Sequence, residues 1–306
     1  MAFKSGFIAV VGLPNAGKST LVNTLVGRKV AIVSPKPQTT RNRIQGIVNR
    51  EDAQIVLIDT PGIHRAGNAL SQQMMSEARQ AIDGIDVLSL IVDATVDFGA
   101  NDRSALDWIG QFHGPVFLLL NKVDRIRKER LLPLIDRYRS LREFAEIVPI
   151  SALTGDGLPD LVKTWISYLP ESPACFPVDE FTDQPERFLA SEFIREKLIA
   201  ATHEELPASL AVAIDTFEES EKLVRIRATI YVEREGQKGI VIGKRGEMLK
   251  KVGTEARIEI EGLLGVKVFL ELFVKVQPNW RQKSGMVRQL DWHHQLEQLS
   301  GDEIEE

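Results

Sequence analysis

Eight consecutive residues near the start of the chain have the types and spacing needed to hold a phosphate chain. They are Gly12, Leu13, Pro14, Asn15, Ala16, Gly17, Lys18 and Ser19, and they fit the pattern G-x-x-x-x-G-K-[ST]. The glycines let the backbone close around an anion, because they adopt conformations that a Cβ would forbid. Lys18 can reach the β- and γ-phosphates of a nucleotide, and the Ser19 hydroxyl can ligate Mg²⁺. A chance glycine turn is the alternative for this motif alone.

The elements expected around this loop favour a nucleotide site. The apolar run Phe7–Val11 predicts a buried strand before the loop, and Lys18–Val26 predicts a helix after it. Backbone N–H groups and the helix N-terminus would then face the phosphates. We include Thr20, the next residue of this helix, among the nucleotide-binding residues.

A second motif lies at the end of the apolar stretch Gln54–Asp59. It consists of Asp59, Thr60, Pro61, Gly62 and Ile63. Asp59 can hold the Mg²⁺ shell, usually through water, and the Gly62 N–H can approach a γ-phosphate because no side chain intervenes. D-x-P-G is also good turn chemistry, but its place downstream of a phosphate loop favours the nucleotide interpretation.

The residues that choose the base are predicted at the ends of two later strands. They are Asn121, Lys122, Val123, Asp124, Ser151 and Ala152. The Asp124 carboxylate can only accept hydrogen bonds, which suits the N1–H and N2–H donors of guanine. Adenine would leave it unpaired at a cost of ~1–3 kcal/mol or more. The Lys122 stem can lie over the purine, and the pair Ser151-Ala152 can donate a backbone N–H to guanine O6. The sequence thus predicts GTP or GDP with Mg²⁺.

These motifs belong to a region, residues 1–168, in which strand-like and helix-like segments alternate. The predicted strands are Phe7–Val11, Gln54–Asp59, Val87–Asp93, Val116–Asn121 and Ile147–Ser151. The predicted helices are Lys18–Val26, Ala69–Ile82, Arg103–Gln111 and Glu129–Arg142. The pattern predicts an α/β GTP-binding domain with a P-loop, a mostly parallel sheet and helices on both faces. Ligands of such sheets bind at the carboxyl ends of the strands.

The pattern changes at residues 169–185, where four prolines predict a semi-rigid linker with a loosely defined orientation of the two halves. Residues 186–280 then read as helix, two strands, two helices and strand, which is a smaller α+β domain. The expected elements are Arg187–Glu205, Leu210–Thr216, Leu223–Glu233, two helical segments around Gly243–Gly246, and Val266–Val276. Residues 281–306 are expected to be a weakly patterned tail with a solvated acidic end, Gly301–Glu306.

The turn between the two helical segments of the second domain has the form of an RNA-binding loop. Its predicted RNA-binding residues are Gly243, Lys244, Arg245, Gly246, Lys250 and Lys251. They match the GXXG loop of a KH domain, which clamps about four nucleotides of a single strand. A helix–turn–helix with a glycine turn is the alternative. Phe269 and Phe273 on the last strand could stack on bases or pack on the helices.

The composition is that of an ordinary soluble protein. The chain has 306 residues, 43% hydrophobic and 26% charged, with a formal net charge of −5. A nucleic-acid site must therefore be a local basic patch. No apolar run predicts a membrane span or a signal peptide. The single cysteine, Cys175, fits a reducing cytoplasm.

Taken together, the motifs resemble the Ras-like translation-factor class of GTPases and, within it, the Era family of bacterial ribosome-assembly GTPases. The resemblance covers nearly the whole chain. It includes Gln38–Arg43, which corresponds to the first switch of the family. The family pattern makes Thr40 the second protein ligand of Mg²⁺, with Thr39 as the runner-up. In the second domain it includes Val232–Lys238, and Val274–Val276 followed by Trp280.

The resemblance implies a GTPase switch that binds small-subunit ribosomal RNA and acts in assembly of the 30S subunit. It also implies a cytoplasmic protein that associates peripherally with the inner face of the cell membrane, and we expect a monomer. Two rival functions stay open. One is a GTPase of the same superfamily that acts on tRNA or at the membrane, although the reactive C-terminal cysteine usual in tRNA-modifying members is missing. The other is an RNA-binding scaffold with a vestigial nucleotide site.

Ile63 departs from the pattern of small GTPases, which place a glutamine there to orient the attacking water. Hydrolysis should then be slow, on the order of 10⁻⁴–10⁻² s⁻¹ without help. The residues expected to act in catalysis are Lys18, Thr40, Gly62 and Asn15. Related GTPases use an asparagine at the place of Asn15 to bind K⁺, which suggests that role here. A simple loop-stabilising role for Asn15 is the alternative.

Overall fold

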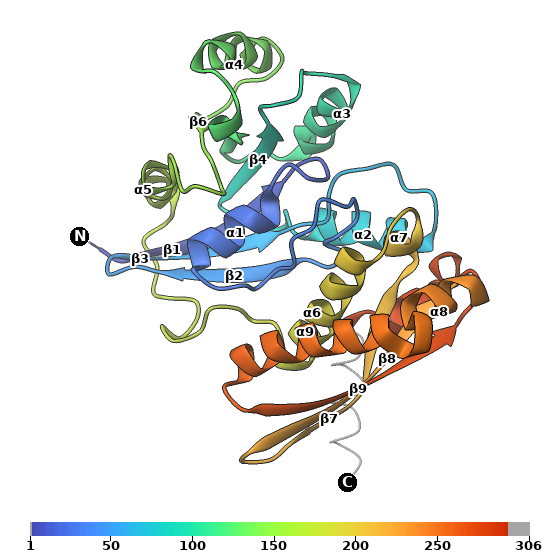
Figure 1. Cartoon of the computed structure of the whole chain (residues 1–306). Helices are drawn as coiled ribbons and strands as arrows, with labels where there is room; N and C mark the ends of the chain where they lie inside the picture. The colour runs from blue at the N-terminus through green and yellow to red at the C-terminus, as the bar shows by residue number, and fades with distance from the viewer. Residues whose placement is uncertain (1, 293–306) are drawn as a thin grey trace. The chain divides into compact units, whose positions relative to one another are not determined.

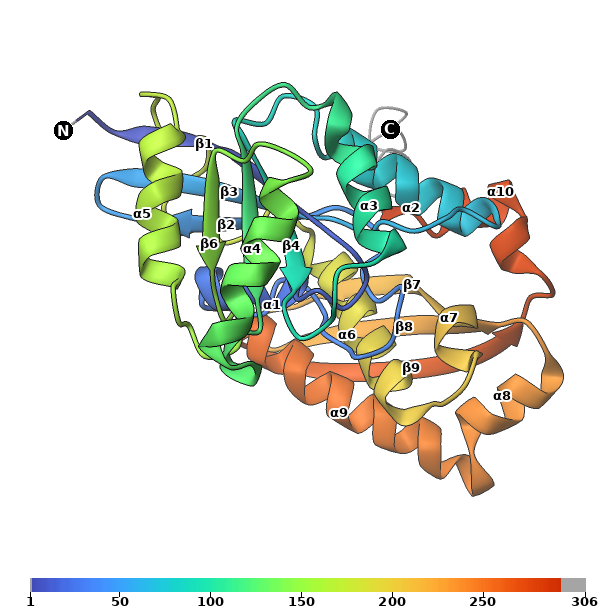
Figure 2. The same cartoon turned by 90° about the horizontal axis from the view of Figure 1, so that it is seen from above.

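The computed structural model of the chain describes residues 2–292 and contains two compact units (Figures 1 and 2). The first consists of Met1–Arg65 and Met74–Asp183, and the second of Ala66–Gln73 and Gln184–Glu306. Each unit has its own sheet and its own buried core, and each is described by itself.

The first unit is built on a six-stranded sheet. Its strands are β1 (Lys4–Val11), β2 (Ile44–Asn49), β3 (Ala53–Asp59), β4 (Val87–Asp93), β5 (Val116–Asn121) and β6 (Glu146–Pro149). They lie in the order β2-β3-β1-β4-β5-β6, and all neighbours are parallel except the antiparallel pair β2 and β3. This confirms the mostly parallel sheet that the sequence predicts.

Helices cover both faces of this sheet. They are α1 (Lys18–Val26), α2 (Ala69–Gln80), α3 (Ala100–Trp108), α4 (Leu131–Arg139) and α5 (Leu158–Tyr168), with short 3₁₀ turns η1 (Ile109–Gln111), η2 (Val123–Arg125) and η3 (Lys128–Arg130). Side chains of α2, α3 and α4 share one apolar core with alternate residues of β1, β4 and β5. On the opposite face, the buried Trp165 of α5 donates its indole N–H to the Ser89 hydroxyl of β4 at 3.1 Å.

The strand β2 is an element that the sequence analysis missed. Its interior holds Gly46, and a Cβ there would lie 2.8 Å from methyl carbons of both Val22 and Val26 on α1. The glycine is therefore required by the close approach of the helix, although it weakens the strand pattern in the sequence. The helix α5 was also not among the predicted helices.

Residues 170–182, predicted as part of a semi-rigid linker, are hydrogen-bonded to the rest of the first unit. We call this segment the strap. The fully buried Gln54 accepts the backbone N–H groups of Cys175 and Phe176 at 2.7 and 2.9 Å. The Ile47 N–H of β2 donates to the Phe181 carbonyl at 2.9 Å. Further hydrogen bonds join Ser5 to Pro170, Asn49 to Val178, and Thr182 to Gln45. The proline-containing strap is thus hydrogen-bonded to residues of β1, β2 and β3.

The second unit is a three-stranded sheet with helices on one face (Figure 1). Its strands are β7 (Ala211–Glu219), β8 (Leu223–Val232) and β9 (Lys267–Val276), in the order β7-β8-β9. β8 runs antiparallel to β7 and parallel to β9. The helices are α6 (Glu186–Ala201), α7 (Leu206–Ser209), α8 (Glu235–Ile242) and α9 (Glu247–Leu264), and η4 (Lys244–Gly246) joins α8 to α9. The predicted α+β order is confirmed.

The predicted tail contains ordered structure where it can be described. η5 (Trp280–Gln282) and α10 (Ser284–Gln289) follow β9. The buried Trp280 donates its indole N–H to the Ser209 carbonyl at 2.8 Å, and Trp292 packs against Phe188 with ring centroids 5.4 Å apart. The acidic end Gly301–Glu306 lies outside the described residues. Across residues 2–292, no helix is both long and apolar enough to cross a membrane.

Candidate nucleotide site and nucleic-acid interface

The loop Gly12–Ser19 follows β1 at the point where the order of the parallel strands reverses, which is where ligands bind in such sheets. Both glycines are required by their surroundings. Gly12 has a φ of 158°, and a Cβ there would lie 2.3 Å from the Ile91 carbonyl oxygen. Gly17 has a φ of 104°, and its Cβ would lie 2.2 Å from the Asn121 side-chain nitrogen. The loop is therefore packed tightly into its place.

Lys18 is folded into the loop that it follows. Its Nζ donates to the carbonyls of Gly12 and Leu13 at 3.2 and 3.0 Å, and the residue is only 6% exposed. Burial lowers the pKa of this ammonium to about 8, and the opposite charge of Asp59 limits the drop. The structure thus holds a buried cation where the phosphates of a nucleotide are expected.

Three predicted metal-binding residues come together beside it. The Ser19 hydroxyl donates to Asp59 Oδ2 at 2.6 Å, and Thr40 Oγ1 lies 2.9 Å from Ser19 Oγ and 3.4 Å from the same carboxylate oxygen. Burial raises the pKa of Asp59 to about 6, against the lowering effects of Lys18 and the two hydroxyls. Its Oδ1 is buried and has no hydrogen-bond partner among the described residues. A hard cation with oxygen ligands fits this donor set.

The same contacts separate the two threonines that the sequence left as alternatives. Thr40 points into the cluster with Ser19 and Asp59. The hydroxyl of Thr39 donates instead to the Lys36 carbonyl at 2.7 Å. The geometry therefore favours Thr40 as the residue that would meet a metal ion.

The second motif lies against the first. A Cβ on Gly62 would lie 2.9 Å from Pro14 atoms, so only glycine fits between them. Ile63 is buried in the apolar core, and its N–H donates to the Gly12 carbonyl at 3.0 Å. Thr60 donates its hydroxyl to the Val10 carbonyl at 2.9 Å, which is a structural contact. Ile63 is thus an anchor, and its side chain is directed away from solvent.

Asn121 joins the phosphate loop to the predicted base site. Its side-chain nitrogen donates to the Ala16 carbonyl at 2.8 Å, and its Oδ1 accepts the Ala152 N–H at 2.9 Å. The sequence analysis assigned a backbone N–H of the pair Ser151-Ala152 to guanine O6, and Ala152 is one of the two candidates. In the structure the Ala152 N–H pairs with Asn121, because a buried donor needs a partner and the amide oxygen is within reach.

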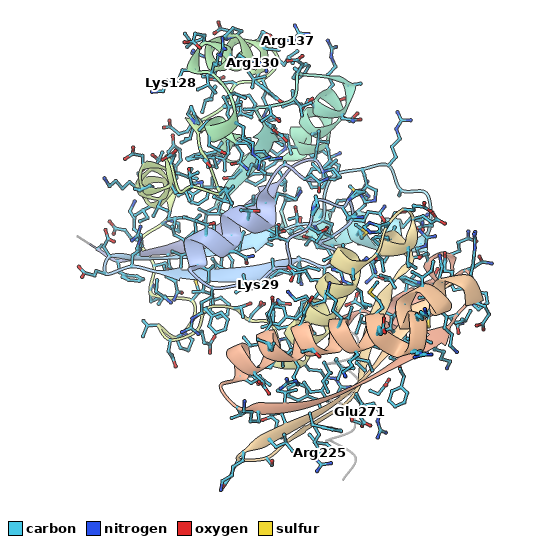
Figure 3. All side chains as sticks on the ribbon, in the orientation of Figure 1. Lys29, Lys128, Arg130, Arg137, Arg225 and Glu271 are labelled. Carbon is cyan, nitrogen blue, oxygen red and sulfur yellow. The ribbon has the colours of Figure 1, made fainter. Side chains whose placement is uncertain are left out.

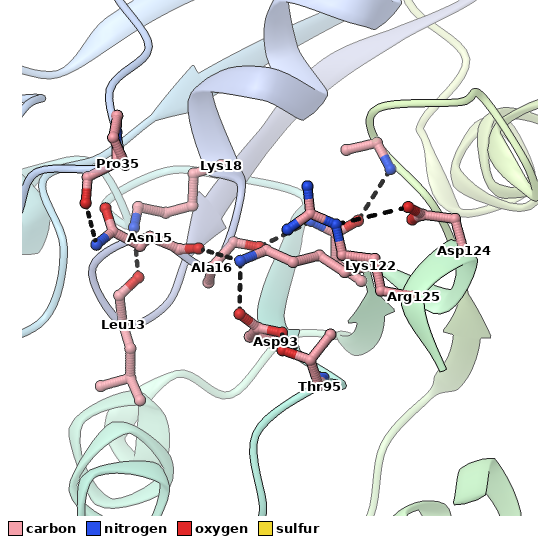
Figure 4. Close-up of polar contacts among 12 residues, drawn as sticks. Leu13, Asn15, Ala16, Lys18, Pro35, Asp93, Thr95, Lys122, Asp124 and Arg125 are labelled. Carbon is pink, nitrogen blue, oxygen red and sulfur yellow. Dashed lines mark hydrogen bonds and ion pairs between the residues drawn. The ribbon is translucent and has the colours of Figure 1, made fainter. Parts of the chain in front are cut away.

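Lys122 makes a second connection at the same place (Figure 4). It lies in the left-handed region with a φ of 67°, and its Nζ donates to the Asn15 carbonyl at 2.8 Å and to Asp93 Oδ2 at 2.5 Å. Burial of Asp93 acts to raise its pKa, but hydrogen bonds from Lys122 and Thr95 hold it below the usual range. Asp93 is a residue that the sequence analysis missed. Its signal was available, since it ends β4 as Asp59 ends β3.

These segments enclose a cavity of about 420 Å³. Of the predicted nucleotide residues, it is lined by Pro14, Asn15, Gly17, Lys18, Ser19, Thr20, Thr40, Gly62, Asn121, Lys122, Asp124, Ser151 and Ala152. The others, Gly12, Leu13, Ala16, Asp59, Thr60, Pro61, Ile63 and Val123, are not among the lining residues. Residues not predicted also line it, among them Pro35, Lys36, Arg125 and Leu153. The Asn15 side chain donates to the Pro35 carbonyl at 2.9 Å.

The predicted RNA loop of the second unit adopts a tight glycine turn. Gly243 has a φ of 73°, and a Cβ there would lie 2.6 Å from Met248 Cβ. Gly246 has a φ of 81° and ends the turn directly before α9. Arg245 takes a left-handed conformation with a φ of 53°. The turn therefore presents its backbone and two basic side chains at the start of a long helix.

Two hollows flank this turn, and each is lined by some of the predicted RNA-binding residues. The first, about 500 Å³, is lined by Ala200, Ala201, His203, Gly243, Lys244, Glu247, Met248 and Lys251. The second, about 400 Å³, is lined by Gly246, Leu249, Lys250, Gly253, Thr254, Arg257, Leu270 and Leu272. The second hollow lies between α9 and β9 and has apolar walls with basic ends. His203 and Arg257 are lining residues that the sequence analysis missed, since neither belongs to the motif.

The fold, the phosphate loop, the carboxylate at the end of β3 and the base motif after β5 define a P-loop GTPase, here joined to a KH domain. Comparison with known families agrees. The family described as 50S ribosome-binding GTPase matches residues 7–122, and the KH domain family matches residues 205–281.

Two curated relatives that cover nearly the whole chain are both GTPases Era. GTPase Era of Syntrophus aciditrophicus is 50% identical over 293 residues, which are 95% of this chain and 96% of that protein. GTPase Era of Ruminiclostridium cellulolyticum is 47% identical over 293 residues, or 95% and 98%. A crystal structure of Era with MgGDPNP and nucleotides 1506–1542 of 16S ribosomal RNA has a TM-score of 0.92 at 43% identity, covering 95% of this chain and 99% of that one.

A crystal structure of an Aquifex aeolicus Era variant bound to GDP·AlF₄⁻ has a TM-score of 0.91 at 43% identity and the same coverage. The chain belongs to the Era family of GTPases. It binds guanine nucleotide and hydrolyses GTP.

Proposed function

We propose that this protein is a slow GTP-dependent switch that binds small-subunit ribosomal RNA through its KH domain and acts in maturation of the 30S subunit. The observation that carries the proposal is the presence, in one chain, of a tightly packed guanine-nucleotide site and an open GXXG turn with flanking hollows. The Era structure bound to both MgGDPNP and a 16S ribosomal RNA fragment supports it. Crosslinking the protein to cellular RNA, followed by sequencing, tests it: enrichment of tRNA over small-subunit RNA would favour the rival function.

In the nucleotide site we assign Lys18 to the β- and γ-phosphates and Asp124 to guanine. Mg²⁺ would be held by the hydroxyls of Ser19 and Thr40, with Asp59 behind them. The unpartnered Oδ1 of Asp59 supports this assignment. A buried carboxylate oxygen needs a partner, either a cation or a hydrogen-bond donor such as a water molecule. Bound Mg²⁺ would neutralise the charge that develops on the transferred phosphoryl group.

For hydrolysis, the buried Ile63 cannot position water, so help must come from elsewhere. Gly62 would offer its N–H to the γ-phosphate from its place against Pro14. We retain the hypothesis that Asn15 helps to bind K⁺ at the phosphates. The structure also gives Asn15 a loop-stabilising contact, the hydrogen bond to Pro35. GTP turnover measured in K⁺ and in Na⁺ separates the two roles, and equal rates would remove the potassium hypothesis.

In the KH domain, Lys244, Lys250 and Lys251 would contact phosphates around the glycine turn, and Gly243 and Gly246 would let the RNA backbone come close. Bases would lie in the hollow between α9 and β9, whose walls include Leu270 and Leu272. Its apolar character suits unstacked bases from a single strand.

Coupling between nucleotide and RNA follows if GTP orders the loops that contain Thr40 and Asp59–Ile63. A nucleotide can change RNA affinity only through its different affinities for two arrangements of the protein. We expect tighter RNA binding with a GTP analogue than with GDP. Titrating the RNA fragment with a GTP analogue, with GDP and without nucleotide tests this, and three identical affinities would contradict it.

Two finer expectations rest on the family resemblance alone. Peripheral association with a membrane would appear as co-sedimentation with anionic vesicles. A monomer would appear as a mass close to that of one chain in light scattering.

A further inference from the structure

The open face of the KH sheet carries a row of aromatic and basic side chains. On β9, Phe269 and Phe273 are 50% and 49% exposed. On β8, residues with buried side chains alternate with exposed ones, and the buried ones face the helices. Phe269 and Phe273 therefore point away from the helices, and Figure 3 shows Arg225 and Glu271 on that same side of the sheet. The structure thus excludes packing on the helices as the reason for these two phenylalanines.

Each phenylalanine is paired with an arginine from the neighbouring strand. The guanidinium of Arg225 lies 5.9 Å from the ring centroid of Phe269, and that of Arg227 lies 5.9 Å from that of Phe273. The register supports this, because Arg225 is directly opposite Phe269. Two pairs, each of one planar guanidinium and one aromatic ring, therefore lie side by side on an exposed surface. We call this surface the Arg–Phe face, and it consists of Arg225, Arg227, Phe269 and Phe273.

We propose that the Arg–Phe face is a second RNA contact, on which unpaired bases of a single strand stack after leaving the GXXG turn. This inference rests on the proposed RNA-binding function and adds a site to it. Single-stranded RNA is recognised by stacking its bases on aromatic rings and guanidinium planes. The charge agrees along β8 and β9, where this face carries Arg225, Arg227, Lys267 and Lys275 against Glu271. The acidic residues Asp215 and Glu218 lie farther from the two phenylalanines, on β7.

The topology gives the RNA a path to this face. β9 is an edge strand, because the sheet order is β7-β8-β9. Leu270 and Leu272 line the hollow beside α9 on one side of β9, whereas Phe269 and Phe273 stand on the other side. A strand of RNA that fills the hollow need only pass around this edge to reach the rings. Phe269 and Phe273 are four residues apart, about 13 Å along the strand, so they would hold separate bases and not one stack.

The Glu271 carboxylate between the two rings indicates which part of the RNA comes close. It is paired with Arg227 at 3.5 Å. A carboxylate repels phosphates but can accept hydrogen bonds from the amino groups of cytosine or guanine. The centre of the Arg–Phe face is thus suited to binding RNA bases, and the cations around it are suited to binding the RNA phosphates.

The test uses the full chain and an RNA with the sequence of nucleotides 1506–1542 of 16S ribosomal RNA, the fragment bound by the related Era structure. Affinity is measured by fluorescence anisotropy for two double variants, Phe269→Ala with Phe273→Ala and Phe269→Leu with Phe273→Leu. Both should weaken binding by at least about fivefold, because leucine keeps the apolar surface but cannot stack. Phe269→Trp with Phe273→Trp should bind at least as tightly as the native protein, because indole rings also stack on bases.

Controls separate this inference from the function on which it rests. Ile258→Ala removes another exposed apolar side chain of the same domain and should leave affinity unchanged. Lys244→Ala with Arg245→Ala tests the GXXG turn itself. If that variant weakens binding while both phenylalanine variants bind as the native protein does, the Arg–Phe face is overturned and the proposed function stands; the face would then suit a protein partner. If the native protein does not bind the fragment, the proposed function fails.

Discussion

The molecule has two loops in which glycines precede a helix, and they differ in what surrounds them. In the loop before α1, the missing Cβ atoms of Gly12 and Gly17 would lie 2.3 and 2.2 Å from protein atoms. In the loop before α9, the three atoms nearest to a Cβ on Gly243 all belong to Met248 in the helix that follows, and Gly246 has no atom within 4 Å of its Cβ position. The first loop is shaped by the protein around it, whereas the second is open on its outer side.

The cations of the two loops differ in the same way. Lys18 is 6% exposed and bonded to two loop carbonyls, while the side chain of Lys251 is 67% exposed. A ligand with one fixed shape, such as a nucleotide, can be met by preorganised groups that pay little to reorganise. A polymer can be held by exposed charge along its backbone, with affinity that depends on salt. The comparison teaches that similar turn chemistry serves two kinds of recognition.

The largest effect is expected when Lys18, the buried cation of the loop before α1, is removed. Lys18→Ala should lower GTP turnover by ~10²–10³-fold, the scale expected for losing one preorganised charge-stabilising group. Affinity for the RNA fragment without nucleotide should stay unchanged. Single-turnover GTP hydrolysis measures the first effect, with the surface variant Lys163→Ala as a matched control. Loss of RNA binding in Lys18→Ala would show that the two loops are not independent.

A second prediction uses the burial of the packed site. The pKa of Asp59 is raised to about 6 in the folded protein, against an ordinary value of 3.8. Between these values the folded protein binds more protons than the unfolded chain, so its stability should fall as pH rises from about 4 to 6. In Asp59→Asn this contribution is absent, so the free energy of unfolding should fall by about 2–3 kcal/mol less over that pH range. Urea unfolding of protein free of nucleotide and metal measures it; an equal pH dependence in both proteins would contradict the prediction.

The base site can be tested by exchanging the hydrogen bonds of one residue. Asp124→Asn replaces an acceptor by a group that also donates, so guanine loses a partner and xanthine, with a carbonyl at C2, gains one. We expect GTP affinity to fall by ~1–3 kcal/mol, with XTP affinity rising above that for GTP. Titration with both nucleotides decides this. An unchanged preference for GTP would place the base-reading group elsewhere.

The smallest expected effect concerns the open loop. Lys244→Ala with Arg245→Ala should weaken RNA binding. The plot of log affinity against log salt should become less steep by up to about 1.4, because each phosphate contact on single strands contributes about 0.7 to its steepness. GTP turnover should not change. A slope equal to that of the native protein would mean that these two side chains do not contact phosphate.

Most of the first unit could be predicted because its inner strands are buried on both faces. Val87–Asp93 and Val116–Asn121 have the bounds that the sequence predicted, since continuous apolar runs between polar ends leave little choice. β2 could not be predicted in this way. Gly46 at its centre is explained only by the helix packed against it, which is a tertiary contact.

The candidate site shows the same division. Motif residues such as Lys18 and Asp124 were found because the chemistry fixes both their types and their spacing. Asp93 was missed because it acts through Lys122, which directly follows the neighbouring strand β5. The contact of Ala152 with Asn121 was missed because motif matching assigns donors to the ligand before it considers partners within the protein.

The strap has a consequence for how far the KH domain can move. One anchor near its end is the hydrogen bond that Thr182 donates to the Gln45 carbonyl, and α6 begins at Glu186. Four Cα–Cα steps separate these residues, which span at most about 14 Å when fully extended. The start of α6 therefore stays within this distance of the anchor. The anchor itself lies on β2, the strand that follows the first switch.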